Sequence, residues 1–447
     1  MTTLTSVPMA PKALPVLGHL ATIVRDPLAF LSSLPEHGDV VQIRLGPAHA
    51  VVVCDPDLTA QVLRNDGVFD KGGPFFESIR EFLGNGIATC PHRLHRRQRR
   101  LAQPVFRTER IPGYAQTVAE QTRAVTSQWH DGQVLDVLDE VKKITSLALG
   151  ATMFSDTLPA ETQHQAIVDI STLFVAATRR MLLPSALSRL PLPGNNRFKQ
   201  ARNRFRDTIT TVIAERRAHD RDCGDLLSAL LAARDVEGDG RGLSDLEITD
   251  TIATIFVAGS ETPGNGLAWA CHMIAAHPDI EAKLHAEVDA VLDGRPVTYA
   301  DVKNLSLTQR VFTETLRMWP PGWVFTRQAT DDTQLGGHFV PAGTTVVYSP
   351  YLLQHRGDLY PDPDRFDPDR WARDQAVPAP NNAFVAFGGG PRKCLGDQFS
   401  TAEAVLVLAT IASKWQLRHL DGRPIRPGFD ANLRPRGLRM RAVARKH

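Results

Sequence analysis

The spacing of apolar residues is helical over most of the chain. Two short runs near the start, 40–45 and 50–54, are instead rich in valine and isoleucine, and Gly46-Pro47 separates them. Short apolar runs bounded by turn residues predict β-strands. From Pro56 onward, apolar positions recur three and four residues apart, which predicts helices. The predicted helices cover the ranges 57–65, 93–106, 114–129, 137–153, 162–180, 197–219, 245–276, 278–292 and 305–318.

The segment 245–276 is unusually long and apolar for a helix. We expect such a helix to be buried and to cross the middle of the molecule. Gly259 and Ser260 are poor helix formers near its centre, and Pro263 lacks the N–H that would bond the carbonyl of Gly259. A kink is therefore expected, which either is purely structural or opens a groove in the core.

Strands return near 334–349, where Gly336-Gly337 and the 341–343 segment indicate turns. After a stretch without periodicity, a helix is expected over 395–414, followed by a strand-like C-terminus. The predicted fold class is mainly α with small β-sheets. Its β-rich part covers approximately residues 38–55 and 323–350, and its helical part covers approximately residues 56–318 and 395–414.

Composition narrows the classes of function. The 447 residues are 43% hydrophobic, so the chain can bury a large core, and its length alone would suggest two or three domains. With 51 basic and 49 acidic residues, the net charge of +2 gives no reason to expect a nucleic-acid partner. Five scattered cysteines, no signal peptide and no run of 18 apolar residues predict a cytoplasmic protein without a membrane anchor.

Cys394 stands in the decapeptide Phe-Gly-Gly-Gly-Pro-Arg-Lys-Cys-Leu-Gly, residues 387–396. Glycines let backbone N–H groups approach a sulfur closely, because no Cβ blocks them. A thiolate held in this way is a strong ligand for haem iron, and hydrogen bonds to the sulfur tune the iron. An isolated cysteine is more commonly a structural residue, but the full pattern Phe-x-x-Gly-x-Arg-x-Cys-x-Gly favours the ligand.

Two further pairs of residues are compatible with such a site. Glu314 and Arg317 lie three apart on one helix face, so they form either a solvated pair or, with Arg370 downstream, a larger cluster. Glu261 and Thr262 lie at the expected kink, where an acid and an alcohol could relay protons.

The basic run 92–100 divides into two opposed stripes when drawn on a helix. One stripe consists of Arg93, Arg96, Arg97 and Arg100, and the other of His95 and Arg99. One could face an anionic cofactor and the other an acidic partner. Arg327, at the end of an apolar segment, is either another cation for a buried carboxylate or an ordinary surface residue.

With these motifs in this order, the chain resembles a cytochrome P450 over nearly its whole length. The cysteine signature is specific, and the Glu-x-x-Arg pair and the Ala-Gly-x-x-Thr segment at 258–262 accompany it. The resemblance implies one domain spanning residues 1–447, which replaces the estimate from length. It also implies that haem lies between the long central helix and the helix after the cysteine loop.

The resemblance implies a role for each motif residue. Cys394 would bind the iron of haem b, and Glu261 and Thr262 would be the catalytic acid and alcohol. The cofactor-binding residues would be His95, Arg99, Arg327, Phe387, Gly390, Arg392 and Gly396. Glu314, Arg317 and Arg370 would form a structural cluster without a catalytic role.

The implied reaction is monooxygenation, in which one atom of O₂ enters an apolar small molecule. Electrons would come from NAD(P)H through a ferredoxin reductase and a ferredoxin, and the candidate docking surface consists of Arg93, Arg97, Arg100 and Lys393. Pro263 directly after Thr262 and Asp397 after the cysteine loop depart from the usual pattern. Because Glu261 and Thr262 are both retained, we expect O₂ rather than peroxide to be the oxidant.

Apolar candidates for a distal pocket suggest a ligand of modest size. They are Phe75, Phe76, Phe82 and Ile87 in an expected loop before the basic helix, with Phe174, Met181, Leu182, Phe256, Ala258, Val324 and Phe325 elsewhere. Phrases at 25–30, 37–41, 94–100, 323–327 and 348–351 are similar to actinobacterial members that oxidise sesquiterpenes. The favoured substrate is therefore a terpene or terpenoid of specialised metabolism. Alternatives are a macrolide, polyketide or fatty acid, or a non-catalytic haem-thiolate binding or sensing protein.

Overall fold

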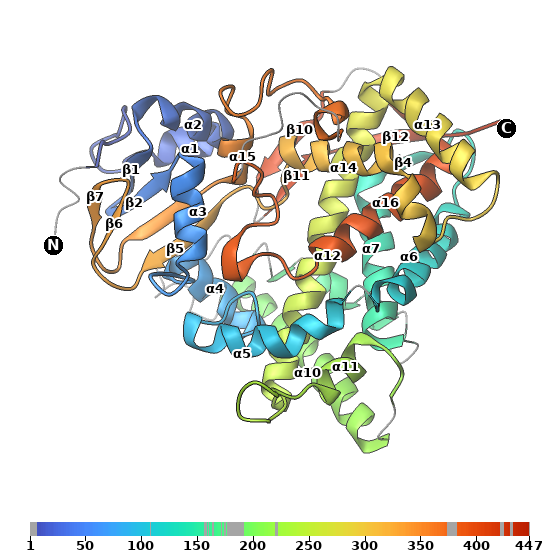
Figure 1. Cartoon of the computed structure of the whole chain (residues 1–447), viewed down its shortest axis with the longest axis horizontal. Coiled ribbons are helices and arrows are strands. Elements are labelled where there is room, and N and C mark those ends of the chain that lie inside the picture. Colours follow the sequence, from blue (N-terminus) through green and yellow to red (C-terminus); the bar gives the residue numbers. More distant parts are fainter. Residues whose placement is uncertain are drawn as a thin grey trace.

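Helices surround one long central helix in the computed structural model of the chain (Figure 1). The structure describes residues 7–107, 109–155, 159, 161–162, 165–170, 172–173, 176, 192–219, 222–372, 382–420, 424–429 and 432–446. The strands lie mostly at one side of the molecule, near the N-terminus. The predicted fold class, mainly α with small β-sheets, is confirmed.

The central helix is α12 (Asp245–Ala276), with the predicted bounds. Ser244 and Glu247 form a capping box at its start, which satisfies backbone donors that a helix N-terminus leaves free. The helix continues through Pro263. Among the described elements, its most extensive helix contact is with α7 (Val137–Phe154).

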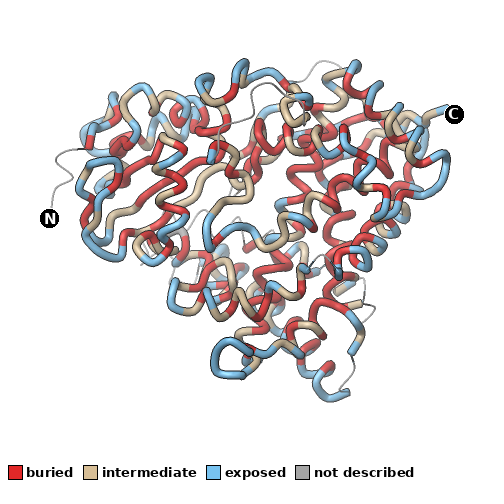
Figure 2. The backbone as a smooth tube through the Cα atoms, viewed as in Figure 1, coloured by how far each residue is buried: buried red, intermediate tan, exposed pale blue. Residues whose placement is uncertain are grey.

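Two apolar clusters pack against different halves of α12. Figure 2 shows that the backbone in the middle of the molecule is mostly buried. The C-terminal half, from Leu267, packs with α6 (Ile111–Thr126), α13 (Pro278–Leu292), α14 (Ser306–Met318) and α16 (Asp397–Lys414). The N-terminal half, up to Val257, packs with α5 (His92–Ala102), α10 (Pro193–His219) and α11 (Leu226–Ala232). Residues 258–266 belong to neither cluster, so the predicted catalytic segment lies between the two clusters.

The described residues also form four sheets. The largest has the order β1-β2-β8-β5-β3, in which only the β2–β8 pair is parallel. Its strands are Val40–Leu45, Ala48–Val53, Thr345–Tyr348, Phe325–Ala329 and Phe69–Asp70. A second sheet joins β4 (Val134–Asp136), β12 (Arg439–Ala444) and β9 (Trp415–His419). The remaining pairs are β6 (Thr333–Leu335) with β7 (His338–Val340), and β10 (Arg426–Phe429) with β11 (Leu433–Arg436).

Short helices connect these elements. The α-helices are α1 (Leu20–Arg25), α2 (Pro27–Ser33), α3 (Pro56–Arg64), α4 (Gly73–Leu83) and α15 (Pro350–Gln354). The 3-10 helices are η1 (Leu34–His37), η2 (Gln103–Phe106), η4 (Tyr299–Asn304), η5 (Pro368–Trp371) and η6 (Gly390–Arg392). Among the described residues, no helix is both long enough and apolar enough to span a bilayer.

The expected loop before the basic helix is wrong, because α4 occupies much of it. Glycine and proline at 72–74 resemble a turn, but they form the start of the helix. The apolar residues that follow, among them Phe76, Ile79 and Phe82, have helical spacing. The predicted helix over 162–180 lies partly outside the described residues.

Candidate active site

The cysteine loop is held by its own backbone. The N–H of Cys394 donates to the carbonyl of Phe387 at 2.9 Å, and the N–H of Gly388 donates to Val385 at 2.8 Å. Gly390 has φ +60°, and a Cβ there would collide with the carbonyl oxygen of Leu63 at 2.2 Å. Gly390 is therefore needed for the loop to pack on α3, as its place in the motif suggested.

The Cys394 side chain is accessible even though protein surrounds it densely. Burial raises the pKa of its thiol, opposed by a backbone hydrogen bond from Gly396 and by the charges of Arg99 and Lys393. Helix α16 begins directly after Gly396, so the positive end of its dipole also favours a thiolate. A cation at the sulfur would complete its ionisation.

The described residues contain no group of three or more His, Cys, Asp and Glu side chains that could hold a metal. A metal at Cys394 would therefore bring its other ligands with it. Iron in a porphyrin does so, and a single axial thiolate from the protein is then sufficient.

Glu314 and Arg317 form a buried ion pair rather than a solvated one. Both residues are 0% exposed, and the guanidinium binds the carboxylate through two hydrogen bonds of 2.9 Å. Arg370 approaches the same carboxylate at 3.2 Å, and the indole N–H of Trp371 donates to it at 2.9 Å. The structure thus brings the three predicted structural residues together.

Gln354 connects this cluster to the cysteine loop. Its amide donates to the carbonyls of Leu316 and Arg317, while its side-chain oxygen accepts the N–H of Val385 at 3.1 Å. Val385 in turn accepts from Gly388 inside the loop. The position of Cys394 therefore depends on the buried pair through a continuous chain of hydrogen bonds.

Arg327 is a buried cation whose guanidinium is incompletely bonded. It is 3% exposed, and its Nε has no hydrogen-bond partner among the described residues. Its other nitrogens reach the carbonyl of Thr326 and the hydroxyl of Tyr348. A buried donor without an acceptor is costly, so this geometry suits an anionic ligand that the protein itself does not provide.

Lys71 joins Arg327 and was missed by the sequence reasoning. Burial, followed by the charges of Arg327 and Arg392, lowers the pKa of Lys71 far below its usual range. Lys71, Arg327 and Arg392 therefore lie within electrostatic reach of one another. Lys71 is a single lysine outside any motif, so no sequence pattern could have identified it.

The other predicted propionate ligands lie near this cluster. Arg392 already pairs with Asp66 at 2.9 Å and with Asp70 at 3.0 Å, so a propionate would have to share it. Arg99 donates to the carbonyl of Lys393 at 2.8 Å. His95 is buried, and burial together with the charge of Arg392 lowers its pKa to about 3, so its imidazole is neutral at pH 7.

Two residues of α12 face open space near its middle. Ala258 and Thr262, one helical turn apart, are both exposed although their helix is central. Glu261 points elsewhere, because its carboxylate lies 2.6 Å from Nζ of Lys142 on α7. The acid and the alcohol of the predicted pair thus occupy different sides of the helix.

The candidate pocket residues divide into four groups. The prediction that Phe82 and Phe256 line the pocket is wrong. They are 0% and 2% exposed and pack inside the core cluster around the N-terminal half of α12. Phe76 is buried beneath Lys71. Ile87, Val324 and Phe325 are half-buried and Ala258 is exposed. The Phe75 side chain, Phe174, Met181 and Leu182 lie outside the described residues.

The predicted docking stripe also needs correction, because part of it is occupied by internal ion pairs. Arg97 lies 2.7 Å from Glu247, and Arg100 binds Asp235 at 2.8 Å. Asp235 lies in the segment before α12, and Glu247 lies in the first turn of α12. The sequence gives no sign that these two acids lie beside the basic run 92–100. Arg93 and Arg96 remain exposed, while exposed Lys393 pairs with Asp397 at 2.6 Å.

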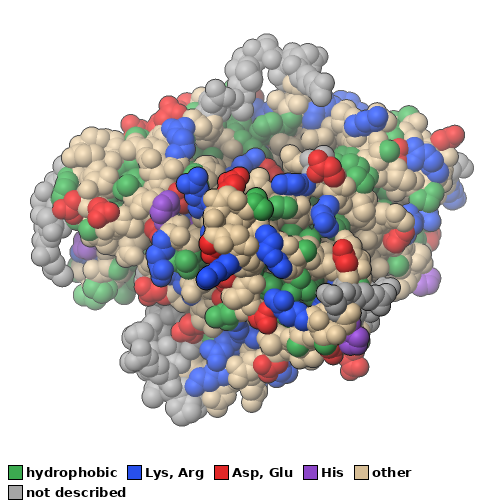
Figure 3. Space-filling view, turned by 60° about the horizontal axis from the view of Figure 1, so that its bottom comes forward, with side chains coloured by type: hydrophobic (Ala, Val, Ile, Leu, Met, Phe, Trp, Pro, Cys, Tyr) green, Lys and Arg blue, Asp and Glu red, His purple; other side chains and the backbone are tan. Residues whose placement is uncertain are grey.

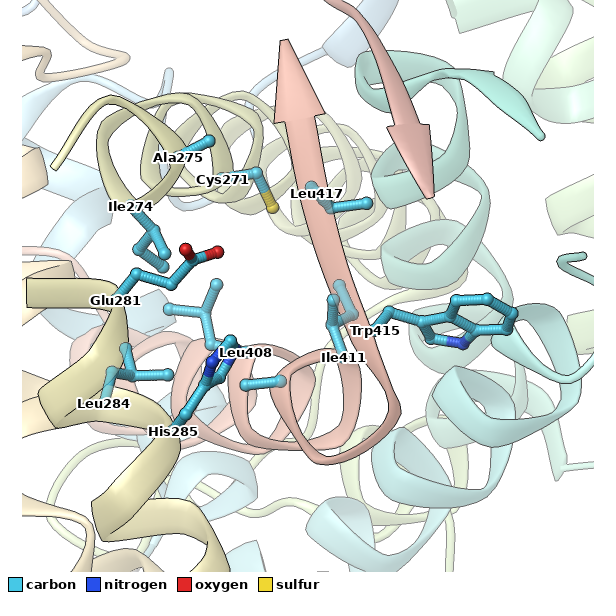
Figure 4. A pocket seen from close by; sticks show the side chains of 11 residues that line it. Cys271, Ile274, Ala275, Glu281, Leu284, His285, Leu408, Ile411, Trp415 and Leu417 are labelled. Carbon is cyan, nitrogen blue, oxygen red and sulfur yellow. The ribbon is translucent and has the colours of Figure 1, made fainter. Parts of the chain in front are cut away.

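Two cavities lie away from this site. One, of about 30 Å³, is enclosed by α12, α13, α16 and β9, with Glu281 and His285 on its wall (Figure 4). A space of that size holds about one water molecule. A larger one, about 450 Å³, lies between α6 and residues 296–300. Neither includes a residue of the cysteine loop.

Comparison with known proteins agrees with this site. The cytochrome P450 family model matches residues 8–438. Pentalenene oxygenase from Streptomyces avermitilis is 44% identical over 437 residues, covering 98% of this chain and 97% of that protein. Cyclooctatin synthase from Streptomyces melanosporofaciens is 44% identical, with coverage of 97% and 94%, and cyclooctat-9-en-7-ol 5-monooxygenase from the same species is 42% identical, with coverage of 92% and 90%. The chain therefore belongs to the cytochrome P450 family, and it is a P450 monooxygenase.

Membership of this family implies a haem-thiolate cofactor, and the described residues fit one. An accessible thiol lies at the start of α16, and the buried Arg327, whose Nε is unbonded, lies near Lys71. Cys394 would bind the iron of a haem, and Arg327 with Lys71 would bind its carboxylates.

Proposed function

We propose that the protein is a ferredoxin-dependent monooxygenase that inserts one atom of O₂ into a terpene or terpenoid of specialised metabolism. The observation that carries the chemistry is the accessible Cys394 thiol, which the loop backbone and the first turn of α16 support. When bound there, haem supplies the activation of O₂, favoured by electron donation from the thiolate.

The chain's own residues hold the cofactor and handle protons. Arg327, with Lys71, His95, Arg99 and Arg392, holds the propionates by charge and hydrogen bonds. The Thr262 hydroxyl faces the open space beside Ala258, where it passes protons to the reacting side. Glu261 supplies Thr262 with protons. Positioned proton transfer of this kind contributes roughly 10²–10⁴ in rate.

A terpenoid substrate is supported by two observations. The names of three relatives that match nearly the whole chain refer to pentalenene oxidation and to cyclooctatin formation. The predicted pocket residues Val324 and Phe325 are half-buried and Ala258 is exposed, so each leaves apolar surface accessible to a ligand. A large apolar ligand would fill such a site without leaving a buried polar group unpaired.

The electron donor is proposed to be an acidic ferredoxin that docks beside α5. Figure 3 is turned so that the bottom of Figure 1 comes forward. On this face, Lys and Arg side chains are mixed with Asp and Glu. Arg97, Arg100 and Lys393 pair with acids of the chain, so the exposed cations proposed for docking are Arg93 and Arg96. Arg93→Glu should raise the KM for reduced ferredoxin and leave substrate affinity unchanged.

Substrate class is tested by titration and turnover. The purified protein is titrated with pentalenene, a cyclooctatin-type diterpene alcohol, a long-chain fatty acid and a macrolide, and the haem spectrum is recorded. We expect a type I shift and an oxygenated product with a terpenoid. If only the fatty acid or only the macrolide gives the spectral shift, that class of compound replaces terpenoids as the proposed substrate.

The same assay separates an oxygenase from a binding or sensing protein. A sensor needs no proton relay, so Thr262→Ala would leave its ligand binding and its peroxide release unchanged. In an oxygenase we expect Thr262→Ala to divert O₂ to hydrogen peroxide while the type I shift is retained. Product and peroxide per NAD(P)H oxidised are the quantities to measure.

A further inference from the structure

The carboxylate of Glu261 is held by a lysine from another helix. Nζ of Lys142 lies 2.6 Å from Oε2 of Glu261, and the two side chains are 22% and 14% exposed. Exposed ion pairs contribute less than about 1 kcal/mol. This pair is shielded by α7 and α12, so its attraction is less screened by water.

Glycine in α12 allows the lysine to reach this position. A Cβ at Gly264 would lie 2.8 Å from Cγ of Lys142 and 3.3 Å from its Cα. Any side chain at 264 would therefore displace either the lysine stem or α7. Glycine weakens a helix interior by roughly 1 kcal/mol, and the passage of Lys142 over the helix accounts for its presence here.

The same junction is held by Thr145, one turn further along α7. Its hydroxyl donates to the carbonyl of Ser260 at 2.9 Å. The carbonyl of Gly259 lacks its usual helical donor, because Pro263 has no N–H. Around Glu261, the backbone of α12 thus depends on α7 as well as on its own hydrogen bonds.

Glu261 lies between two groups that can exchange protons. Successive helical residues point about 100° apart, so Glu261 faces α7 while Thr262 faces the open space beside Ala258. On the α7 side, the exposed Asp139 lies within electrostatic reach of Lys142, and burial and the charge of Asp136 raise the pKa of Asp139. The exposed Asp139 therefore lies near Lys142, which contacts Glu261.

We propose that Lys142 is a positioning residue for the proton relay of this enzyme. Its ammonium holds the Glu261 carboxylate on the α7 side of α12, where the carboxylate takes up a proton from solvent and passes it to Thr262. Lys142 acts through Glu261 and contacts neither substrate nor cofactor. This inference rests on the proposed function, because it assumes that Glu261 and Thr262 deliver protons.

The first test measures the ion pair in the apoprotein. Urea unfolding is recorded for Lys142→Met, Glu261→Gln and the double variant. Because each single change removes the same interaction, we expect the double variant to lose less stability than the sum of the two single losses. Additive losses would show that the pair is absent in solution and would overturn the proposal.

The second test measures proton delivery in the holoenzyme with pentalenene as the probe. Lys142→Met should lower the product formed per NAD(P)H by about ten-fold, a part of the contribution of positioned proton transfer. It should also raise the kinetic solvent isotope effect on NAD(P)H oxidation. Lys142→Arg should restore much of the coupling, and Lys143→Met, the same change at the exposed neighbour, should not alter it.

Thr262→Ala distinguishes failure of this inference from failure of the proposed function. If Thr262→Ala diverts O₂ to peroxide while Lys142→Met behaves like the wild type, the relay is correct and the role of Lys142 is wrong. If Thr262→Ala has no effect on peroxide, the relay itself is wrong and the proposal for Lys142 falls with it. Equal uncoupling in Lys142→Met, Glu261→Gln and their combination is the result expected.

Discussion

Two buried arginines on different sides of the fold differ in how completely the protein satisfies them. Arg317 is 0% exposed, and its three nitrogens bind Glu314 and the carbonyl of Gln354 at 2.8–2.9 Å. Arg327 is 3% exposed, stacks its guanidinium 5.3 Å over the ring of Tyr348, and has an unbonded Nε. The residue type and burial are the same, but among the described residues only Arg317 has a carboxylate partner.

The difference separates a structural arginine from a ligand-binding one. Arg317 and Glu314 form a complete unit that fixes Gln354 and, through it, the cysteine loop. Arg327 is held in an incomplete environment, which an external carboxylate would complete. Burial alone would assign both arginines the same role, whereas hydrogen-bond completeness distinguishes them.

The largest expected effect comes from removing the anion of the complete site. Glu314→Gln leaves Arg317 buried without a counter-charge, and breaking such a pair costs about 3–5 kcal/mol. We expect a loss of that size in the free energy of unfolding of the apoprotein, measured by urea denaturation. Glu287→Gln is a control with a smaller loss, because the half-buried Glu287 on α13 accepts from neutral donors, among them the N–H groups of Leu307 and Thr308. A loss below about 1 kcal/mol for Glu314→Gln would show that the pair does not support the fold.

The incomplete site should respond in the opposite way. Arg327→Met removes a buried donor whose missing partner costs about 1–3 kcal/mol, so the apoprotein should be as stable as the wild type or more stable. Haem should dissociate faster, since the propionate loses its buried cation. Haem transfer to an excess of apomyoglobin measures this rate. If Arg327→Met instead destabilised the apoprotein as much as Glu314→Gln and left the rate of haem loss unchanged, the distinction between the two arginines would be wrong.

A pH dependence should appear near the cation cluster. The pKa of His95 is about 3 in the folded chain and about 6.5 in an unfolded one. The unfolded state therefore binds more protons between these values, and stability from this source is lost as the pH falls from about 6.5 toward 3. Urea unfolding of the apoprotein across this range should be less pH-dependent in His95→Gln. The exposed His130→Gln is the control, and parallel curves for wild type and His95→Gln would contradict the burial of neutral His95.

The smallest effect is expected at Glu403 on α16. Its carboxyl oxygens are buried without a hydrogen-bond partner in the described structure, and burial raises its pKa to about 8. The folded state then holds a proton that the unfolded state releases above about 4.3, so stability falls as the pH rises toward 8. Glu403→Gln should be nearly neutral at pH 4 and stabilising at pH 9. Equal stability of the two proteins at both pH values would show that this carboxyl has a partner in solution.

The sequence predicted the parts of the site that are carried by local motifs. These parts are the bounds of the long central helix, the Cys394 loop and the Glu314–Arg317 pair. Each was predicted from residues that lie close together in the sequence. Long-range pairings were not predictable in this way. Nothing near Arg97 or Arg100 in the chain indicates that Asp235 and Glu247 neutralise them.

The same limit applies to the groups around the cofactor. Lys142 and Glu261 are far apart in the sequence, and so are Lys71 and Arg327, so only folding reveals each association. The errors at α4 and at Phe82 have a different origin. Apolar residues with helical spacing can line a pocket or belong to the core, and the spacing does not distinguish the two. Phe82 belongs to the core because it packs against α10.

The central claim is that Cys394 is the thiolate ligand of haem iron. The direct measurement is the absorption spectrum of the reduced protein with carbon monoxide. We predict the red-shifted Soret band that is typical of thiolate-ligated haem, and we predict that Cys394→Ser loses it while Cys90→Ser, a buried cysteine near Arg392, retains it. A wild-type spectrum without the red-shifted band, or a band that persists in Cys394→Ser, would contradict the account.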